Sequence, residues 1–144
     1  MLTPFFQHLP PESAPLEITG YDLDIKHHHL TLKAVSTQQS ACCPLCKTAT
    51  HRVHSRYHRT LADLSCVHFS LVILLEVCKF FCDNSDCPRR IFTERLPKIA
   101  APWARKTVRL VQRLQQVALA LGGAAGANLA TQLGVVVCCE MSIT

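Results

Sequence analysis

A chain of 144 residues has room for one domain or two small ones. Hydrophobic residues make up 49% of it, which is enough for a core, and its net charge is +5 at pH 7. The apolar run of residues 67–81 is shorter than the roughly 20 residues that cross a membrane, and the N-terminus lacks the basic region of a signal peptide. We therefore expect that the chain does not associate with a membrane and that it is located in a reducing cytoplasm.

The positive charge is concentrated in the middle of the chain. Residues 41–113 hold 13 of the 15 lysines and arginines but only five of the ten acidic residues. A basic segment of this kind suggests a polyanion as partner, although an ordinary solvated surface has the same composition.

The first 40 residues predict a proline-rich arm followed by a β-hairpin. Four prolines lie within residues 1–15, so this stretch should be loosely ordered. Hydrophobic and polar residues then alternate in residues 16–24 and again in 30–35, as they do in strands, with a turn between them. The adjacent histidines at 27–29 would point to opposite faces of a strand, which favours a solvated turn over a metal site.

Two closely spaced cysteine pairs dominate the next segment. Two residues separate Cys43 from Cys46, and four separate Cys82 from Cys87. When two such turns meet, they provide four thiolates in a tetrahedron, which is the arrangement of a structural Zn2+ site. The alternatives are buried free thiols, disulfides, which need an oxidising compartment, and a Cys-x-x-Cys redox site, which usually accompanies a βαβ pattern.

Other residues near these pairs bear on the site. Cys42 adjoins Cys43 and is a second candidate ligand, but the Cys-Pro-x-Cys spacing favours Cys43, while Cys66 and Cys78 are expected to be structural thiols. Lys47 stands where such a turn usually has glycine, and a positive φ there would cost roughly 1–2 kcal/mol.

The alternation in the spacer between the pairs predicts a strand or extended arm in residues 51–61 and a strand in residues 67–81. Arginines in and after this spacer, and in the helical segment beyond it, are candidates for contacts with DNA phosphates. They are Arg52, Arg56, Arg59, Arg89, Arg90, Arg105 and Arg109. Asp63 is expected to form an ion pair with one of the first three.

Several of these blocks occur in an order and spacing typical of one family. The segments CPLCKTATHRVHSRYHRTLADL and FFCDNSDCPRRIFTERLP resemble the N-terminal zinc-finger region of bacterial insertion-sequence transposases of the ISL-three type. The likeness runs over residues 43–97 and more weakly to residue 134. It implies binding to the terminal inverted repeats of the element, and a catalytic domain in which three acidic residues hold two metals. That domain would lie beyond residue 144, so no catalytic residue is predicted here.

Residues 98–136 predict two helices. Pro102 is expected to begin the first helix and Gly122 to end it, and a second, shorter helix is expected to end at Gly134. The buried stripe of the first helix is predicted to be Trp103, Thr107, Leu110, Leu114, Val117 and Leu121, and the inner positions of the second Leu129, Ala130 and Leu133. The second helix and its turn read as part of a helix-turn-helix or as a plain helical hairpin.

The tail does not continue this pattern. Residues 137–144 lack a helix cap, and β-branched residues and two cysteines surround the place where a recognition helix should begin. Compared with the family, this reads as a truncated or frameshifted end.

Together these features predict an α+β chain in four segments. They are an arm and hairpin in 1–40, a zinc ribbon in 41–97, a helical, partial helix-turn-helix segment in 98–136, and the aberrant tail in 137–144. The predicted function is zinc-dependent, non-catalytic binding of insertion-sequence ends in a bacterial cytoplasm, as a homodimer or with an intact transposase. The alternatives are a zinc ribbon that binds protein and a thiol redox protein that uses Cys43 and Cys46.

Overall fold

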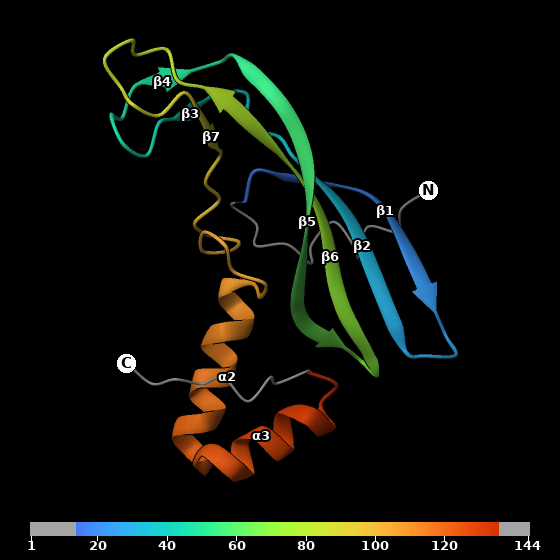
Figure 1. The fold of residues 1–144 in the computed structure, drawn as a ribbon. Helices are drawn as coiled ribbons and strands as arrows, with labels where there is room; N and C mark the ends of the chain where they lie inside the picture. The colour runs from blue at the N-terminus through green and yellow to red at the C-terminus, as the bar shows by residue number, and fades with distance from the viewer. Residues whose placement is uncertain (1–13, 136–144) are drawn as a thin grey trace.

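The computed structural model describes residues 14–135, which form an α+β fold made mostly of strands (Figure 1). In chain order the elements are β1 (Leu16–Asp24), β2 (His29–Ser36), β3 (Ala41–Cys42), β4 (Ala49–Thr50), β5 (Val53–Cys66), β6 (Phe69–Phe81), β7 (Ile91–Thr93), α2 (Val108–Leu121) and α3 (Gly123–Gln132). The predicted proline-rich arm and the predicted tail lie almost entirely outside the described residues. Within these residues, no helix is long and apolar enough to cross a membrane.

One five-stranded sheet connects most of the chain. Its order is β1-β2-β6-β5, and β7 pairs with the end of β6. The neighbours β2 and β6 run parallel, whereas β1–β2, β5–β6 and β6–β7 are antiparallel. The predicted hairpin and both predicted spacer strands are therefore present, but they belong to a single sheet.

The burial pattern of β6 changes along its length. From Leu71 to Val77 the odd-numbered residues are buried, as the alternation predicted. From Cys78 onward the even-numbered residues Phe80 and Cys82 are buried instead. A side-chain period of two means that this change moves the buried side to the other face of the strand. The sheet is therefore covered on different faces at its two ends.

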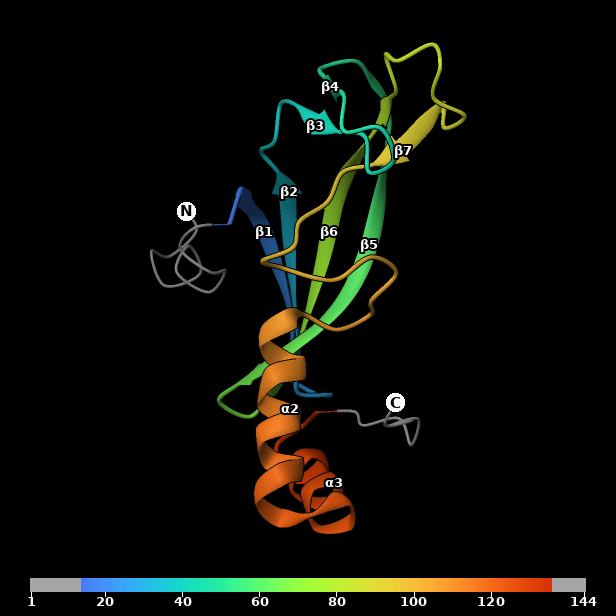
Figure 2. The same cartoon turned by 90° about the vertical axis from the view of Figure 1, so that its left-hand side faces the viewer.

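Two hydrophobic clusters correspond to these two ends. One includes Leu61, Ile73 and Leu75 of the sheet and is closed by Leu96 and Ile99 of the segment that follows β7. The other surrounds the cysteines and includes Phe80 and Phe92, whose rings lie 6.1 Å apart. We call residues 39–50 with 82–93 the zinc end, and α2 with α3 the helical end; they lie at opposite ends of the molecule (Figure 2).

The first of the two predicted helices is α2, which begins at Val108. The prediction that Pro102 begins this helix was therefore wrong. Pro102 and Trp103 lie in a turn, where Trp103 has a φ of 64° and its side chain is 94% exposed. The helix cannot include this conformation, and it begins after Thr107, whose side chain accepts a hydrogen bond from the N–H of Leu110. Gly122, with a φ of 78°, ends the helix as predicted.

The predicted buried stripe is correspondingly shorter. Leu110 is buried, and Thr107 is buried as the cap, but Leu121 is half exposed. In the second helix Ala130 is buried, whereas Leu133 is exposed. The described part of this segment thus contains two helices, but a helix-turn-helix is not shown, because the position of a recognition helix lies outside the described residues.

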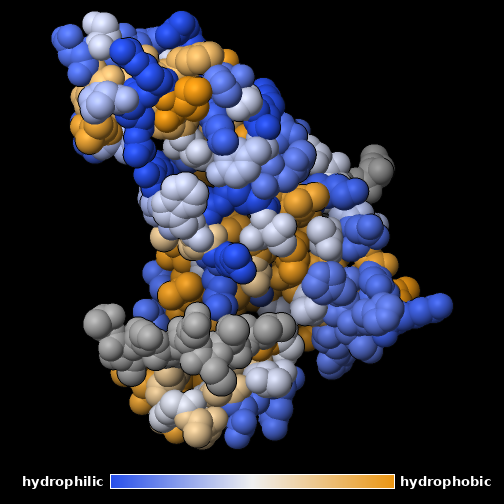
Figure 3. Space-filling view, in the orientation of Figure 1, coloured by the Kyte–Doolittle hydropathy of each residue, from blue (hydrophilic) through white to orange (hydrophobic). Residues whose placement is uncertain are grey.

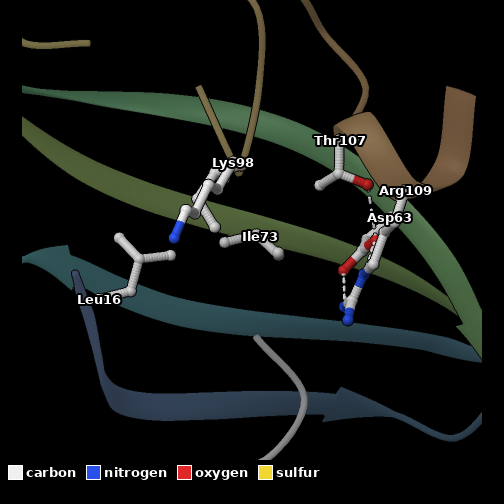
Figure 4. A pocket seen from close by; sticks show the side chains of 7 residues that line it. Leu16, Asp63, Ile73, Lys98, Thr107 and Arg109 are labelled. Carbon is white, nitrogen blue, oxygen red and sulfur yellow. Dashed lines mark hydrogen bonds and ion pairs between the residues drawn. The ribbon is translucent and has the colours of Figure 1, made fainter. Parts of the chain in front are cut away.

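A buried polar joint attaches α2 to the sheet. Asp63 of β5 accepts a hydrogen bond from the Thr107 hydroxyl at 2.7 Å and pairs with both Arg109 Nε, at 2.8 Å, and the guanidinium Nη2 (Figure 4). The Asp63 side chain is fully buried. The expected pairing of Asp63 with Arg52, Arg56 or Arg59 was therefore wrong.

Candidate functional site

The first cysteine pair lies in a tight turn between the short strands β3 and β4. The N–H of Lys47 donates to the carbonyl of Cys43, and the N–H of Cys43 donates to the carbonyl of Thr48, both at 2.9 Å. Lys47 has a φ of 62°, as the glycine-like position predicted. The turn holds the two sulfurs on one side, and the ladder between β3 and β4 closes its base.

The second cysteine pair lies in the loop between β6 and β7. Cys82 comes directly after β6, and its N–H donates to the carbonyl of Arg90 at 2.8 Å. The N–H of Cys87 donates to the carbonyl of Asn84 at 3.2 Å, and the Asn84 side chain accepts from the N–H of Asp86. The four-residue gap is thus taken up by a turn built around Asn84.

The two turns bring the four sulfurs of Cys43, Cys46, Cys82 and Cys87 to within 4.8 Å of one another. The sulfurs of Cys43 and Cys87 are 3.9 Å apart, and those of Cys46 and Cys82 are 3.5 Å apart. Four sulfurs bound at about 2.3 Å to one tetrahedral zinc ion would be about 3.8 Å apart. The residues present therefore fit a zinc ion, and in all seven cysteines of the described part of the chain the thiol is free.

The distances also bear on the redox alternative. A disulfide needs sulfurs about 2.05 Å apart. The two close contacts join a cysteine of one turn to a cysteine of the other, rather than Cys43 to Cys46. A metal ion needs sulfurs from both turns close together, whereas a Cys-x-x-Cys redox centre uses the two thiols of one turn.

The cluster is closed to solvent on most sides. Cys43, Cys82 and Cys87 are buried, and Cys46 is half-buried. Four protein ligands leave no open position for water or substrate, which is the character of a structural rather than a catalytic zinc site. Outside the cluster, Cys42 is exposed, Cys66 is half-buried, and Cys78 is buried beside the cluster.

The surroundings favour thiolate at some of these sulfurs and oppose it at others. Hydrogen bonding to Thr48 lowers the pKa of Cys46 to about 6. The backbone N–H of Asn84 acts in the same direction on Cys82, but burial and the neighbouring thiols raise its pKa to about 12. Burial also raises the pKa of Cys87. A bound divalent cation would favour the thiolate form at all four sulfurs. Its binding would therefore release protons from the thiols.

The predicted phosphate contacts are not equally available. Arg52 pairs with Asp83 at 2.6 Å, and Arg56 pairs with Glu76 at 3.1 Å. Arg59 donates to the carbonyls of Ala101 and Ala104, and Arg109 belongs to the Asp63 joint. Arg89, Arg90 and Arg105 are exposed.

A groove brings three of the predicted arginines together with cations that the sequence did not single out. It has a volume of about 940 Å3 and lies between β5, β6, β7 and the segment leading to α2. Its basic residues are Arg59, Lys79, Arg89, Arg95 and Arg105. In the space-filling view the left side of the molecule is hollowed between the zinc end and the helical end (Figure 3). Lys79 and Arg95, which the sequence did not single out, belong to no motif. They come together only because β7 pairs with β6.

Residues 39–87 match a family described as the zinc-finger of transposase IS204/IS1001/IS1096/IS1165. No curated protein and no solved structure matches the chain. The match covers the first cysteine pair, β5, β6 and the second pair, which are the parts that build the cluster. Together the family and the geometry identify the metal as Zn2+. Residues 39–87 are thus similar to the zinc ribbon of these transposases, and their four clustered cysteines are placed to bind one zinc ion.

Proposed function

We propose that this chain binds the terminal inverted repeats of an insertion sequence during DNA transposition, and that Cys43, Cys46, Cys82 and Cys87 hold the zinc ion that keeps its binding surface folded. The observation that carries the proposal is the basic groove beside the transposase-type zinc ribbon. Among the described residues, none of the ion pairs involves Lys79, Arg89, Arg95 or Arg105. Within this part of the chain, these four side chains need not break an ion pair with a carboxylate before they bind a phosphate.

Zinc has a structural part in this function. When bound, it joins the two cysteine turns and so fixes the end of β6 and the start of β7. Lys79 lies near the end of β6, Arg89 follows Cys87, and Arg95 follows β7. The metal would therefore hold the groove cations in place without taking part in any reaction.

The arginines differ in what DNA binding would ask of them. Arg89 and Arg105 face the groove, and Arg90 is exposed beside it, so these three are the preferred phosphate contacts. Arg52 and Arg56 would have to exchange a carboxylate for a phosphate. Arg59 and Arg109 serve the fold where they are, so we assign them the smallest direct part.

A gel-shift titration of the zinc-loaded chain on a duplex with the element's inverted repeats tests the proposal. If about four phosphates are neutralised, log K should fall against log salt with a slope near −3.6. The double change Arg89→Ala with Arg105→Ala should flatten the slope by about two units. The change Lys26→Ala, at the exposed β1–β2 turn, is the matched control and should alter it little. Salt-insensitive binding, or none, would contradict the proposal.

A second function, association with protein, is favoured by the helical end. Leu119 is 88% exposed, and Val111, Leu121 and Leu133 are also exposed. Three of these side chains lie on α2 and Leu133 directly follows α3, and exposed apolar groups of this kind suit a homodimer or an intact transposase as partner. Analytical sedimentation of the natural chain and of the Leu119→Glu variant distinguishes a monomer from a dimer. If the natural chain is a dimer and the variant is a monomer, the homodimer is supported. If both are monomers, it is contradicted.

A further inference from the structure

We propose that the basic groove binds an unpaired DNA strand, with Trp103 stacking on its bases. The proposal rests on the proposed function in taking DNA as the ligand, and it adds the form of DNA that the groove selects. Its basis is the juxtaposition of an exposed aromatic ring with several cations along one groove.

The charge of the groove suits a phosphate backbone. Among the residues that the structure describes, five basic residues line it, and the one acidic residue that lines it is Glu94. Glu94 is buried, and its carboxylate already accepts hydrogen bonds from the N–H of Cys78 at 2.7 Å and the Ser36 hydroxyl at 2.8 Å. The accessible part of the groove therefore presents positive charge.

Trp103 is placed at this groove by a strained turn. The N–H of Ala104 donates to the carbonyl of Ala101 at 3.1 Å, so residues 101–104 form a turn with Pro102 second and Trp103 third. A positive φ at the third position, after a proline, is the pattern of a type II turn, in which that position is usually glycine. A bulky residue with a φ of 64° is an outlier, and such conformations gather where function requires them.

The turn is held from the sheet side. Arg59 of β5 donates to the carbonyl of Ala104 at 2.8 Å and to that of Ala101 at 3.3 Å, the two ends of the turn. The segment that follows is fixed by the N–H of Ala62, which donates to the carbonyl of Arg105. The Trp103 ring is therefore exposed, and the backbone that carries it is already held in place before a strand binds.

A second aromatic residue lies in the same groove. Tyr57 of β5 is half-buried, and the ammonium group of Lys79 lies 5.0 Å from the centre of its ring. Phe92 also lines the groove but is buried, so the groove combines two accessible aromatic rings with cations. Single-strand binding proteins use this combination. A duplex keeps its bases stacked inside, where Trp103 cannot reach their faces. An unpaired strand exposes those faces while its phosphates meet the cations.

The experiment uses the single tryptophan of the chain as its probe. Addition of a short oligothymidylate to the zinc-loaded full chain should quench the Trp103 fluorescence, while the same length of duplex should quench it weakly. Anisotropy of a labelled oligothymidylate then gives the affinity of variants. Trp103→Gly should weaken single-strand binding roughly 5- to 150-fold, the usual worth of one stacked base. Trp103→Phe should retain most of the binding.

The choice of glycine separates recognition from folding. Because glycine suits a third turn position with positive φ, Trp103→Gly should melt no earlier than the natural chain and keep its zinc. Its affinity for the duplex should fall much less than its affinity for the single strand. Lys79→Gln should weaken single-strand binding, and Lys26→Gln, which removes the same charge outside the groove, should not.

The outcomes distinguish this inference from the proposed function. Single-strand affinity that survives Trp103→Gly, or fluorescence that a duplex quenches equally, overturns the inference and leaves duplex binding standing. If the natural chain does not bind the inverted-repeat duplex but binds a single strand in a way that depends on Trp103, the proposed target is overturned. The inference that the groove binds an unpaired strand is then supported.

Discussion

The zinc end and the helical end each depend on one buried polar centre, but the two centres differ in kind. At the zinc end four sulfurs lie inside a small cluster with Phe80 and Phe92, and the adjoining strands β3 and β4 have two residues each. At the helical end α2 buries Leu110 and is attached by Asp63, and α3 buries Gly126 and Ala130. The first region has little regular structure and a strong internal link, whereas the second has regular structure and a weak attachment.

Removal of zinc should give the largest effect, and it should be confined to the zinc end. A structural zinc site contributes about 10–16 kcal/mol of apparent binding free energy, which is folding free energy for the part that it joins. We expect a chelator, or Cys46→Ser with Cys82→Ser, to unfold the cysteine turns while α2 remains partly helical. Metal analysis and circular dichroism measure the two parts separately.

The adjacent thiol offers the matched control for this experiment. Cys42→Ser removes an exposed cysteine next to Cys43 and should leave one zinc per chain. Full zinc retention in the double variant, or zinc loss in Cys42→Ser, would show that the ligands are assigned wrongly. Acid should also release the metal, because protons compete for the four thiolates.

Breaking the Asp63 joint should be the next largest effect, and it should affect the helical end. Asp63→Ala leaves Arg109 without its buried carboxylate, and removal of one partner from a buried pair costs about 3–5 kcal/mol. Since Arg109 is 30% exposed and can be partly hydrated, we expect the lower limit of this range. Hydrogen exchange should show α2 opening while the zinc content stays unchanged.

An arginine on the same helix provides the comparison. Arg113 is exposed and bonds to Gln116 one turn away. Arg113→Gln should change the free energy of unfolding by no more than about 0.5 kcal/mol. Equal losses in Asp63→Ala and Arg113→Gln would mean that the joint does not attach the helix.

A third change tests the junction between the zinc end and the sheet. Glu94 joins Ser36 of β2 to Cys78 of β6 through its two carboxylate oxygens. Glu94→Leu leaves a buried N–H and a buried hydroxyl without this acceptor, which should cost about 1–3 kcal/mol in thermal unfolding. Glu94→Gln keeps an acceptor for Cys78 and a donor for the Ser36 hydroxyl, so it should cost clearly less. A larger loss in the glutamine variant would contradict the role of these hydrogen bonds.

The sequence predicted the zinc end better than the helical end, and the reason is the range of the interactions. The turn at Lys47 and the alternation of β6 are local properties, and the two cysteine spacings together indicate one cluster. Pro102 suits the first turn of a helix as well as the second position of a tight turn. The choice is made by Arg59, which lies more than 40 residues away and bonds to both ends of that turn.

The same limit applies to the groove and to Asp63. The Arg109 partner of Asp63 is separated from it by 46 residues, so proximity in sequence favoured the wrong arginines. Lys79 and Arg95 reach the groove because β7 folds back against β6. The basic composition predicted a surface that binds a polyanion, but the pairing of β6 with β7 determines which basic residues form it.

The smallest effects should come from two glycines of α3, which test how closely the helical end is packed. At Gly126 an added Cβ would lie 3.2 Å from the Cα of Ala118 in α2, and this backbone has little room to move. At Gly123 the same atom would meet nothing within 4 Å. Alanine is favoured over glycine in a helix by up to about 1 kcal/mol. Gly123→Ala should therefore raise the stability by a few tenths of a kcal/mol, whereas Gly126→Ala should lose that gain to the clash and lower the melting temperature. Equal stabilisation by both changes would mean that α2 and α3 separate freely, and that the helical end has no packed interior of its own.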